Sequence, residues 1–301
     1  MHFKTNTPVK VFIIIMVFVF STLSACSPKS QSTDAKSDTK NVINHSTITP
    51  TQVPVKVTQP LETITPALDN KGTPNISSAP KPDTISVKYI GNSCFYITFP
   101  DGTRLVTDPY GTDGEYFFGT FPIMEADVIT ISHDHSDHVA GINQVLGNPK
   151  IIRADGINKT TKIGKVKITG YTSEHVAYLG ENIIFVYQYG DYKIVAMGET
   201  DNIESKKAIN AVKGADLILA YAGEYGDVKN ADSFKKLIDL NIKVMIPQHY
   251  SNIPDRIFYG QPNINTILKE VPKGIAVTKE DEFIVSKDMK PQFVELEHWG
   301  K

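Results

Sequence analysis

The chain has 301 residues and a formal net charge of −2, with 31 basic residues against 33 acidic ones. This length allows one or two domains. The near-neutral charge gives no sign of the basic surface that nucleic-acid binding needs, so we do not expect a nucleic-acid partner.

The N-terminal segment has the pattern of an export signal. Lys4 and Lys10 give it a positive start, and Val11 to Phe20 is an unbroken apolar run. A transmembrane helix needs about 20 apolar residues, so this run is too short to span a bilayer. We therefore interpret residues 1–25 as a signal peptide that takes no part in the fold.

The two cysteines lie in different contexts. Cys26 closes the sequence Leu-Ser-Ala-Cys, which resembles the lipobox of bacterial lipoproteins. The resemblance implies cleavage before Cys26, and lipidation there would anchor the protein to the outside of the bacterial cell membrane. The alternatives are an uncleaved anchor or a soluble secreted protein. Cys94 lies in an apolar stretch, and we interpret it as a small buried residue rather than a reactive thiol.

A change in composition separates the N-terminal region from a folded domain. Ser, Thr, Pro, Lys, Asn and Gln dominate residues 27–84, where there is no aromatic residue. Such a segment cannot bury enough apolar surface to offset the entropy of ordering it. We expect residues 26–84 to be a disordered, lipid-anchored tether and residues 85–301 to be the folded domain.

The predicted domain begins with strands. Short runs rich in apolar and β-branched residues predict strands over residues 85–90, 94–99, 104–108 and 126–132. The last of these runs is continuously apolar, as expected of a strand buried on both faces. A helix is predicted over residues 138–146, ending at Gly147.

Strands and helices alternate in the rest of the domain. Strands are predicted over residues 166–171, 183–187, 192–197, 216–221 and 243–247, with a last strand over 282–285. Helices are predicted over residues 203–212, 231–240 and 264–271. This pattern favours an α/β (α+β) domain in which helices cover sheets, rather than an all-β sandwich.

The strongest motif is His133-Asp134-His135-Ser136-Asp137-His138, directly after the apolar run at 126–132. Histidines and carboxylates at this density suit Zn²⁺, Fe or Mn²⁺. His133 and His135 can project toward one ion, and Asp137 and His138 toward a second. The alternative, a polar surface loop that is rich in histidine, fits this spacing less well.

The same motif resembles the signature of the metallo-β-lactamase superfamily. Residues 89–97 and the pair Asp108-Pro109 are similar to the opening of its ascorbate-6-phosphate-lactonase-like branch. The resemblance covers about residues 85–285. It implies a four-layer αββα sandwich with a metal site at one edge, between the two sheets.

The resemblance also implies the remaining metal ligands. His175, Glu199 and His249 stand where the family carries a histidine, a bridging carboxylate and a final histidine. One ion would be held by His133, His135 and His175, and the other by Asp137, His138 and His249. We expect two divalent ions, with Zn²⁺ favoured and Mn²⁺ or Fe as alternatives. All five histidines between residues 85 and 297 fall at these positions.

One position departs from the family pattern. The family usually has aspartate where this chain has Glu199, and the extra methylene moves the carboxylate by about 1.5 Å, against a tolerance of about 0.2 Å in ligand distances. Glu199 can still bridge if the strand end shifts, Asp201 can replace it, or the second ion can bind weakly. The metal count is therefore open at this stage.

The implied reaction is hydrolysis of a small-molecule ester, lactone or phosphodiester by a metal-bound hydroxide. Asp137 would orient the nucleophile or accept its proton, as in relatives. Tyr250 and Arg256 follow the last histidine and are candidate substrate contacts, although a solvated loop arginine is an equal alternative for Arg256. Tyr178, near His175, is equally ambiguous.

Two other functions compete with the hydrolase. A surface lipoprotein that binds a metal or ligand without catalysis would keep the fold with a degraded site, and Glu199 is the feature that supports it. A nuclease or DNA-uptake role is less consistent with the near-neutral charge. The resemblance to the lactonase-like branch also makes β-lactam hydrolysis an unexpected activity.

Overall fold

The computed structural model describes residues 83–112, 121–223, 229–251 and 261–299. The predicted signal peptide, the lipidated Cys26, the tether up to residue 82 and Arg256 lie outside the described residues, and they stay predictions. In the described part of the chain, no helix is both long enough and apolar enough to cross a membrane.

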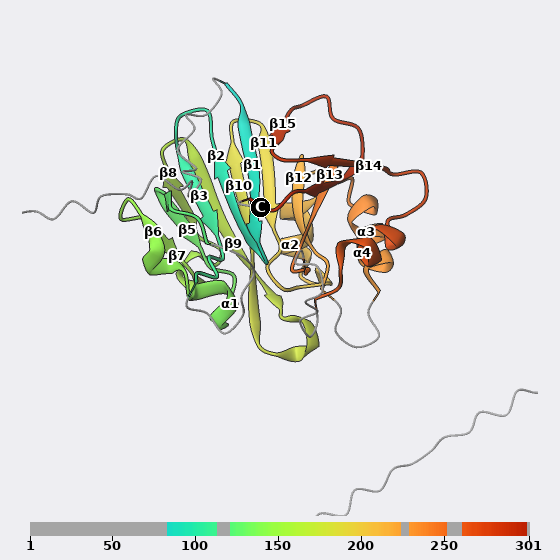
Figure 1. Ribbon diagram of the computed structural model, residues 1–301, viewed down its shortest axis with the longest axis horizontal. Coiled ribbons are helices and arrows are strands. Elements are labelled where there is room, and N and C mark those ends of the chain that lie inside the picture. The colour runs from blue at the N-terminus through green and yellow to red at the C-terminus, as the bar shows by residue number, and fades with distance from the viewer. Residues whose placement is uncertain (1–82, 113–120, 224–228, 252–260, 300–301) are drawn as a thin grey trace, which may run out of the picture. The chain divides into compact units, whose positions relative to one another are not determined.

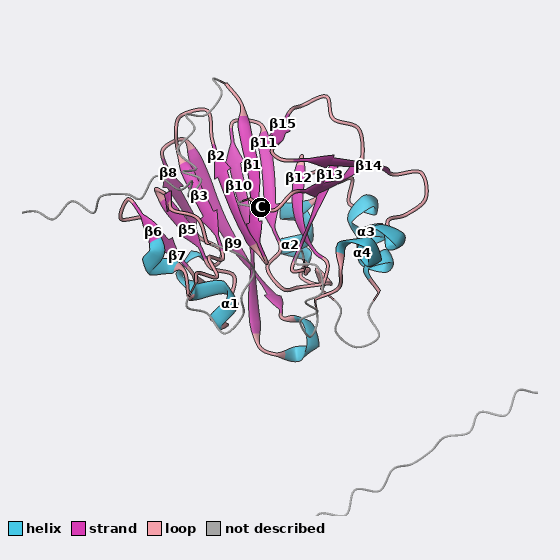
Figure 2. Cartoon of the chain, in the orientation of Figure 1, coloured by secondary structure: helices cyan, strands magenta, loops and turns pink. Residues whose placement is uncertain are grey.

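Two sheets dominate the described residues (Figures 1 and 2). In spatial order, the six-stranded sheet contains β15 (Phe283–Val285), β1 (Ile85–Gly91), β2 (Cys94–Thr98), β3 (Arg104–Thr107), β5 (Val128–Thr130) and β7 (Lys150–Ile152). The eight-stranded sheet contains β14 (Ala276–Glu280), β16 (Gln292–Leu296), β13 (Val244–Gln248), β12 (Leu217–Tyr221), β11 (Tyr192–Ala196), β10 (Glu181–Tyr189), β9 (Val166–Glu174) and β8 (Thr160–Ile163). A small ribbon pairs β4 (Met124–Glu125) with β6 (Val145–Leu146).

The two large sheets share one apolar core. Ile85 and Phe95 of the first sheet belong to the same buried cluster as Ile168 and Leu217 of the second. The inner faces of two sheets pack in this way when apolar residues line both. The domain is therefore a sandwich of mixed sheets, as predicted.

The helices in the described residues are few and short. They are α1 (Ser136–Val139), α2 (Lys206–Val212), α3 (Asn230–Asp239) and α4 (Ile264–Glu270). Helix α3 buries Phe234 and Leu237, and the ring of Phe234 lies 5.3 Å from that of Phe293 on β16. Figure 2 shows α2, α3 and α4 beside the eight-stranded sheet. These three helices form the outer layer over the eight-stranded sheet.

The predicted helix over residues 138–146 is wrong. Helix α1 ends at Val139, a 3-10 turn spans Ile142–Gln144, and the chain then enters β6. Gly141 packs against the backbone of Gly111 so closely that a Cβ atom on Gly141 would lie 2.5 Å from the amide nitrogen of Gly111. After this point the ribbon covers the outer face of the six-stranded sheet, where Met124 and Val145 lie in one buried cluster with Ile90 and Val106.

The strand directions bring several loops to one edge of the sandwich. Strand β5 runs parallel to β3, and β11 runs parallel to β12 and β13. Strand β9 is antiparallel to β10, which is antiparallel to β11, so β9 also points the same way as β11. The carboxyl ends of β9, β11 and β13 therefore meet at one edge, and the loops that follow them can build a site there.

Candidate metal centre

The histidine-rich motif leaves the end of β5 and turns at once into α1. The backbone N–H of Ser132 donates to Oδ1 of Asp108 at 2.7 Å, which fixes the start of the motif. Helix α1 begins at Ser136 and has a single turn, which contains Asp137 and His138, both buried. The strand holds the backbone while the short helix turns the last two residues of the motif inward.

Three more segments bring side chains to the same place. His175 directly follows β9, Glu199 follows β11 after a turn at Gly198, and His249 directly follows β13. Gly198 has a φ of +60°, a conformation that glycine adopts without the strain that a side chain would cause. His249 shares this left-handed conformation, with a φ of +59° and its N–H bonded to the carbonyl of Asn92 at 2.8 Å.

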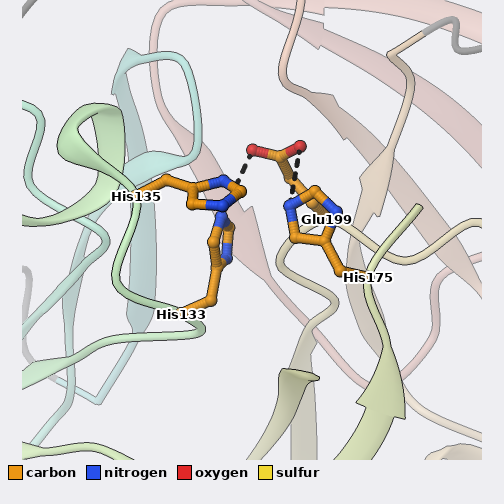
Figure 3. Close-up of side chains that lie close together, drawn as sticks. All are labelled: His133, His135, His175 and Glu199. Atoms are coloured by element: carbon orange, nitrogen blue, oxygen red, sulfur yellow. Dashed lines mark ion pairs between the residues drawn. The ribbon is translucent and has the colours of Figure 1, made fainter. Parts of the chain in front are cut away.

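The first group of potential ligands contains three histidines and one carboxylate (Figure 3). Its members are His133, His135, His175 and Glu199, each offering one ligand atom, and these atoms lie within 4.8 Å of one another. Nε2 of His133 is 3.6 Å from Oε1 of Glu199, and Nε2 of His175 is 3.4 Å from Oε2.

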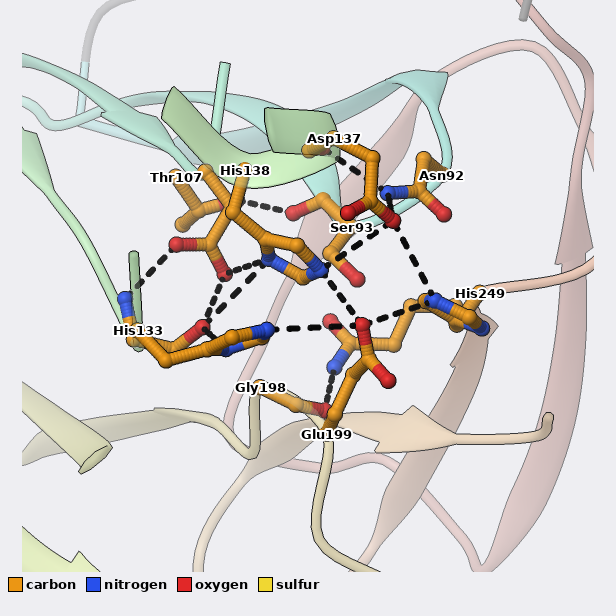
Figure 4. A network of polar contacts seen from close by, with 12 residues as sticks. Asn92, Ser93, Thr107, His133, Asp137, His138, Gly198, Glu199 and His249 are labelled. Atoms are coloured by element: carbon orange, nitrogen blue, oxygen red, sulfur yellow. Dashed lines mark hydrogen bonds and ion pairs between the residues drawn. The ribbon is translucent and has the colours of Figure 1, made fainter. Parts of the chain in front are cut away.

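The second group shares the same carboxylate (Figure 4). Its members are Asp137, His138, Glu199 and His249, with ligand atoms again within 4.8 Å of one another. Oε1 of Glu199 is 2.7 Å from Nε2 of His138 and 2.8 Å from Nε2 of His249. Glu199 is thus the one residue common to the two groups found among the described residues.

The sequence and the fold were compared with those of known proteins. Residues 86–249 match the family model described as a β-lactamase superfamily domain, and this range is more than half of the chain. It runs from the first strand to the last candidate ligand. The chain belongs to this family.

Relatives of this superfamily domain include two bacterial proteins that are each named a UPF0173 metal-dependent hydrolase. The one from Rubrobacter xylanophilus is 25% identical over 199 residues, which are 56% of this chain and 82% of the relative. The one from Enterococcus faecalis is 25% identical over 191 residues, which are 54% of this chain and 85% of the relative.

A solved structure supports the same fold. It is a proposed Zn-dependent hydrolase of the metallo-β-lactamase superfamily from Thermotoga maritima, with 24% sequence identity and a TM-score of 0.55. The match covers 71% of this chain and 99% of that protein. The mixed sheets with few helices are therefore the metallo-β-lactamase fold.

The longer side chain at position 199 of this superfamily domain reaches both groups of ligands. The Glu199 N–H donates to Oδ1 of Asn182 at 2.9 Å, and the carbonyl of Gly198 accepts from Nε2 of Gln248 at 2.5 Å. These bonds hold the turn so that the carboxylate points between the histidines. Asp201, the alternative ligand, belongs to neither group.

Burial and charge divide the histidines into two kinds. Burial lowers the pKa of His133 to about 4 and also lowers the pKa of His175. Burial opposes the charged form of His249 too, yet the carboxylates of Glu199 and Asp137 raise its pKa to about 9. His133 and His175 are therefore neutral at pH 7, the form that binds metal, whereas a metal ion must displace a proton from His249.

The carboxylates of the site stay ionised. Burial alone would raise the pKa of Asp137 and Glu199, but the positive charges of nearby imidazoles, His138 and His249 among them, hold both pKa values well below the usual range. Buried carboxylates of this kind need cations beside them. The ionised carboxylates therefore favour binding of a cation at the site.

The residues present fit divalent metal ions. Within the described residues, Nε2 of His133 and Nε2 of His175 are buried without a hydrogen-bond partner, although both face the Glu199 carboxylate. Such orphaned nitrogen atoms are rare in folded proteins unless a ligand uses them. Imidazoles with a carboxylate are the donor set of zinc, and they also suit iron and manganese.

Several supporting residues were not identified as part of the site from the sequence. Asn92 donates to Oδ2 of Asp137 at 3.1 Å, and Oδ2 of Asp108 lies 3.3 Å from Nδ1 of His138. The hydroxyl of Ser132 lies 3.0 Å from Nδ1 of His133. Asn92 and Asp108 stand in the two stretches singled out above, residues 89–97 and Asp108-Pro109, and this position was the only signal of their role in the sequence. An isolated amide or carboxylate has no diagnostic spacing, so the sequence could not identify them.

The Asp108 carboxylate should tune metal affinity through His138. If Nε2 of His138 binds metal, its Nδ1 carries a hydrogen and needs an acceptor, which Asp108 supplies. In Asp108→Asn, one oxygen can still accept from Ser132, but the amide NH₂ opposes the Nδ1–H group. We expect metal affinity to fall about 10–100-fold, measured by competition with a chelator.

The control for this measurement is Asp134→Asn. Asp134 lies in the same motif but pairs with Arg153 on the surface and belongs to neither group of ligands. Its replacement should leave metal affinity unchanged. Equal losses in the two variants would mean that Asp108 has no specific role.

The three residues predicted as possible substrate contacts lie in different surroundings. Tyr250 is buried, its ring stacks on that of Tyr89 with centroids 5.2 Å apart, and its hydroxyl donates to the carbonyl of Leu296 at 3.3 Å. It packs in the core here, and its contact with substrate stays a prediction. Tyr178 is exposed beside His175, and Arg256 is outside the described residues.

Proposed function

We propose that this chain is a metal-dependent hydrolase that cleaves an ester, a lactone or a phosphodiester in a small molecule. The observation that carries the proposal is the convergence of seven potential ligands from four separate segments of the chain, with one of them, Glu199, shared by both groups. The names of the relatives from Rubrobacter xylanophilus and Enterococcus faecalis support it. The resemblance to the lactonase-like branch supports the range of substrates.

We propose two divalent ions, with zinc as the native metal. His133, His135 and His175 would hold one ion, Asp137, His138 and His249 the other, and Glu199 both. Divalent ions in such a site lower the pKa of water and polarise the bond to be broken. The buried walls of the site strengthen these electrostatic effects because they exclude bulk water.

The chain's own residues orient the reacting groups. Asn92 donates both to Oδ2 of Asp137 and to its carbonyl, at 3.1 and 3.0 Å. These two bonds fix the carboxylate of Asp137 where it can orient the attacking nucleophile or accept its proton. Gln261 in turn donates to Oδ1 of Asn92 at 3.0 Å, which fixes the amide that holds Asp137.

The test is metal content together with turnover in the full-length protein purified in detergent. We expect about two ions per chain by elemental mass spectrometry. We expect hydrolysis of at least one of 4-nitrophenyl acetate, γ-butyrolactone and bis(4-nitrophenyl) phosphate, which a chelator abolishes and zinc restores. His135→Ala should lose metal, whereas His45→Ala, a histidine of the predicted tether, should not.

The outcomes separate the two candidate functions. Two ions without turnover of any of these substrates or of related esters, lactones and phosphodiesters would favour the non-catalytic binding protein. No bound metal after supplementation with zinc, manganese or iron would overturn the hydrolase proposal.

We also propose that the enzyme acts outside the cytoplasm on a lipid anchor at Cys26. The apolar run after Lys10 and the lipobox-like sequence before Cys26 support this. A Cys26→Ser variant should move from the membrane fraction to the soluble fraction or stay as an unprocessed precursor. An unchanged membrane fraction with normal processing would contradict the proposal.

A further inference from the structure

The loop after His175 has an unusual backbone. It runs from Val176 to Gly180, and within it Ala177 and Tyr178 both have a φ of 58°, so this turn is not helical. Two successive residues in the left-handed region carry backbone strain here, because neither Ala177 nor Tyr178 is the glycine or asparagine that this region favours. Such strain is kept where the surrounding structure holds it in place, and it gathers at functional sites.

The loop is tied at its base to the metal centre. The N–H of His175 donates to the carbonyl of Gly180 at 2.9 Å, which closes the loop. The N–H of Val176 donates to the carbonyl of Glu199 at 2.8 Å. The loop therefore has a fixed position relative to two candidate ligands, His175 and Glu199. A substrate that contacts the loop would have a defined position relative to the metal centre.

At its tip the loop exposes two large apolar side chains. Tyr178 is 85% exposed and Leu179 is 54% exposed. Neighbouring exposed apolar residues indicate a binding surface more often than single ones do. Their position beside the metal centre points to the substrate as the binding partner.

The two side chains line two different cavities, and each cavity includes candidate metal ligands. Tyr178 lines a cavity of about 670 Å³ together with His175. Leu179 lines a cavity of about 580 Å³ together with His133 and His135. Both volumes are in the range of small-molecule sites.

The walls of the two cavities differ in character. The cavity of Leu179 has an aliphatic side next to the histidines, formed by Ile131, Ala154 and Ile183. Charged residues line the rest of it: Asp134, Arg153, Asp155 and Glu181. The cavity of Tyr178 is lined mainly by polar and charged side chains, among them Asp201 and Lys236. An apolar part of a substrate therefore fits the aliphatic side of the first cavity, against Leu179.

We propose that the loop at residues 176–180 determines substrate specificity. Leu179 packs against an acyl or aryl group of the substrate in the cavity beside His133 and His135. This inference rests on the proposed hydrolase function and adds the class of substrate: a hydrolysable group with an apolar arm. Tyr178 marks the boundary with the polar cavity, where the other part of the substrate lies.

The test compares binding of two metal-binding probes that differ only in an apolar tail, acetohydroxamate and octanohydroxamate. Dissociation constants are measured by calorimetry on the zinc-supplemented full-length protein. We expect the octanoyl probe to bind about tenfold more tightly, because each buried methylene contributes to affinity. In Leu179→Ala this preference should fall about threefold.

The matched control is Leu146→Ala. Leu146 is also 54% exposed, but it lies on β6 and lines neither cavity. The preference should be unchanged in this variant, and melting temperatures should show that both variants fold. An equal affinity for the two probes, no binding of the octanoyl probe, or an equal loss in both variants would overturn the proposal.

Probe binding does not require turnover, so the two proposals can fail separately. A protein that prefers the octanoyl probe through Leu179 but hydrolyses nothing would keep the apolar subsite and lose the hydrolase function. Turnover of short and long acyl esters at equal rates, with no preference between the probes, would keep the hydrolase function and overturn the apolar subsite.

Discussion

Replacing Glu199 with glutamine should lower both metal affinity and hydrolysis by more than ~100-fold, a larger effect than loss of a supporting residue. Glutamine has nearly the same shape but no negative charge, and its NH₂ group cannot bind a metal ion. Because Glu199 belongs to both groups of ligands, one substitution should weaken both of the proposed ion sites. Metal content by elemental mass spectrometry and chelator competition measure the effect.

Two further variants sharpen this test. Glu280→Gln removes an exposed carboxylate that belongs to neither group of ligands and lines neither cavity, and it should change neither quantity. Glu199→Asp retains the charge but withdraws it by about 1.5 Å, so the close contacts with His138 and His249 would lengthen. It should recover only part of the affinity. Full metal content in Glu199→Gln would show that Glu199 is not the shared ligand.

Gly198→Ala should destabilise the domain by about 3 kcal/mol, because it adds a steric clash to backbone strain. A Cβ atom at this position would lie 2.5 Å from the Cβ of Ser132 and closer still to Oδ1 of Asn182. That oxygen accepts the Glu199 N–H, so Asn182 cannot move away without releasing the turn. A melting temperature lower by about 6–12 °C is expected for a domain of this size.

Gly214→Ala is the matched control for strain alone. Gly214 has a φ of +69°, similar to the +60° of Gly198, but a Cβ atom there would meet nothing within 4 Å. It should cost only about 1–2 kcal/mol. Equal changes in melting temperature would show that the clash at Gly198 is relieved by small movements.

The strands that the sequence predicted are rich in apolar and β-branched residues. The segments at β1, β5, β12 and β13 are buried along their whole length, and hydrophobicity marks such strands directly. Strands β8 and β14 lie at the edges of the eight-stranded sheet, carry polar residues, and were missed. Edge strands gain their pairing from a neighbour that is distant in the sequence, so local pattern does not identify them.

Two further errors have a tertiary origin. The segment at residues 282–285 was taken as the last strand, but β16 follows it and pairs with both β13 and β14. The helix predicted over residues 138–146 had Val139, Ile142 and Val145 at helix-like spacing. The chain instead packs Gly141 against the backbone of Gly111, and no local pattern reports a contact between such distant residues.

The candidate site was more predictable than the fold around it. The ligand histidines follow strand ends at family spacing, so the sequence was enough to nominate them. The reach of Glu199 was not predictable, because it depends on the turn at Gly198 and on the amides of Asn182 and Gln248. These partners come from separate strands that only the folded sheet brings together.

If the chain holds two ions as proposed, the carboxylate common to both groups of ligands makes the two sites thermodynamically linked. Whichever ion arrives first must fix the Glu199 side chain and displace protons from neighbouring imidazoles. The second ion then meets a ligand that is already ordered, and it also meets the positive charge of the first. The balance of these two opposing effects decides whether the chain fills with metal in one cooperative step or in two separate ones.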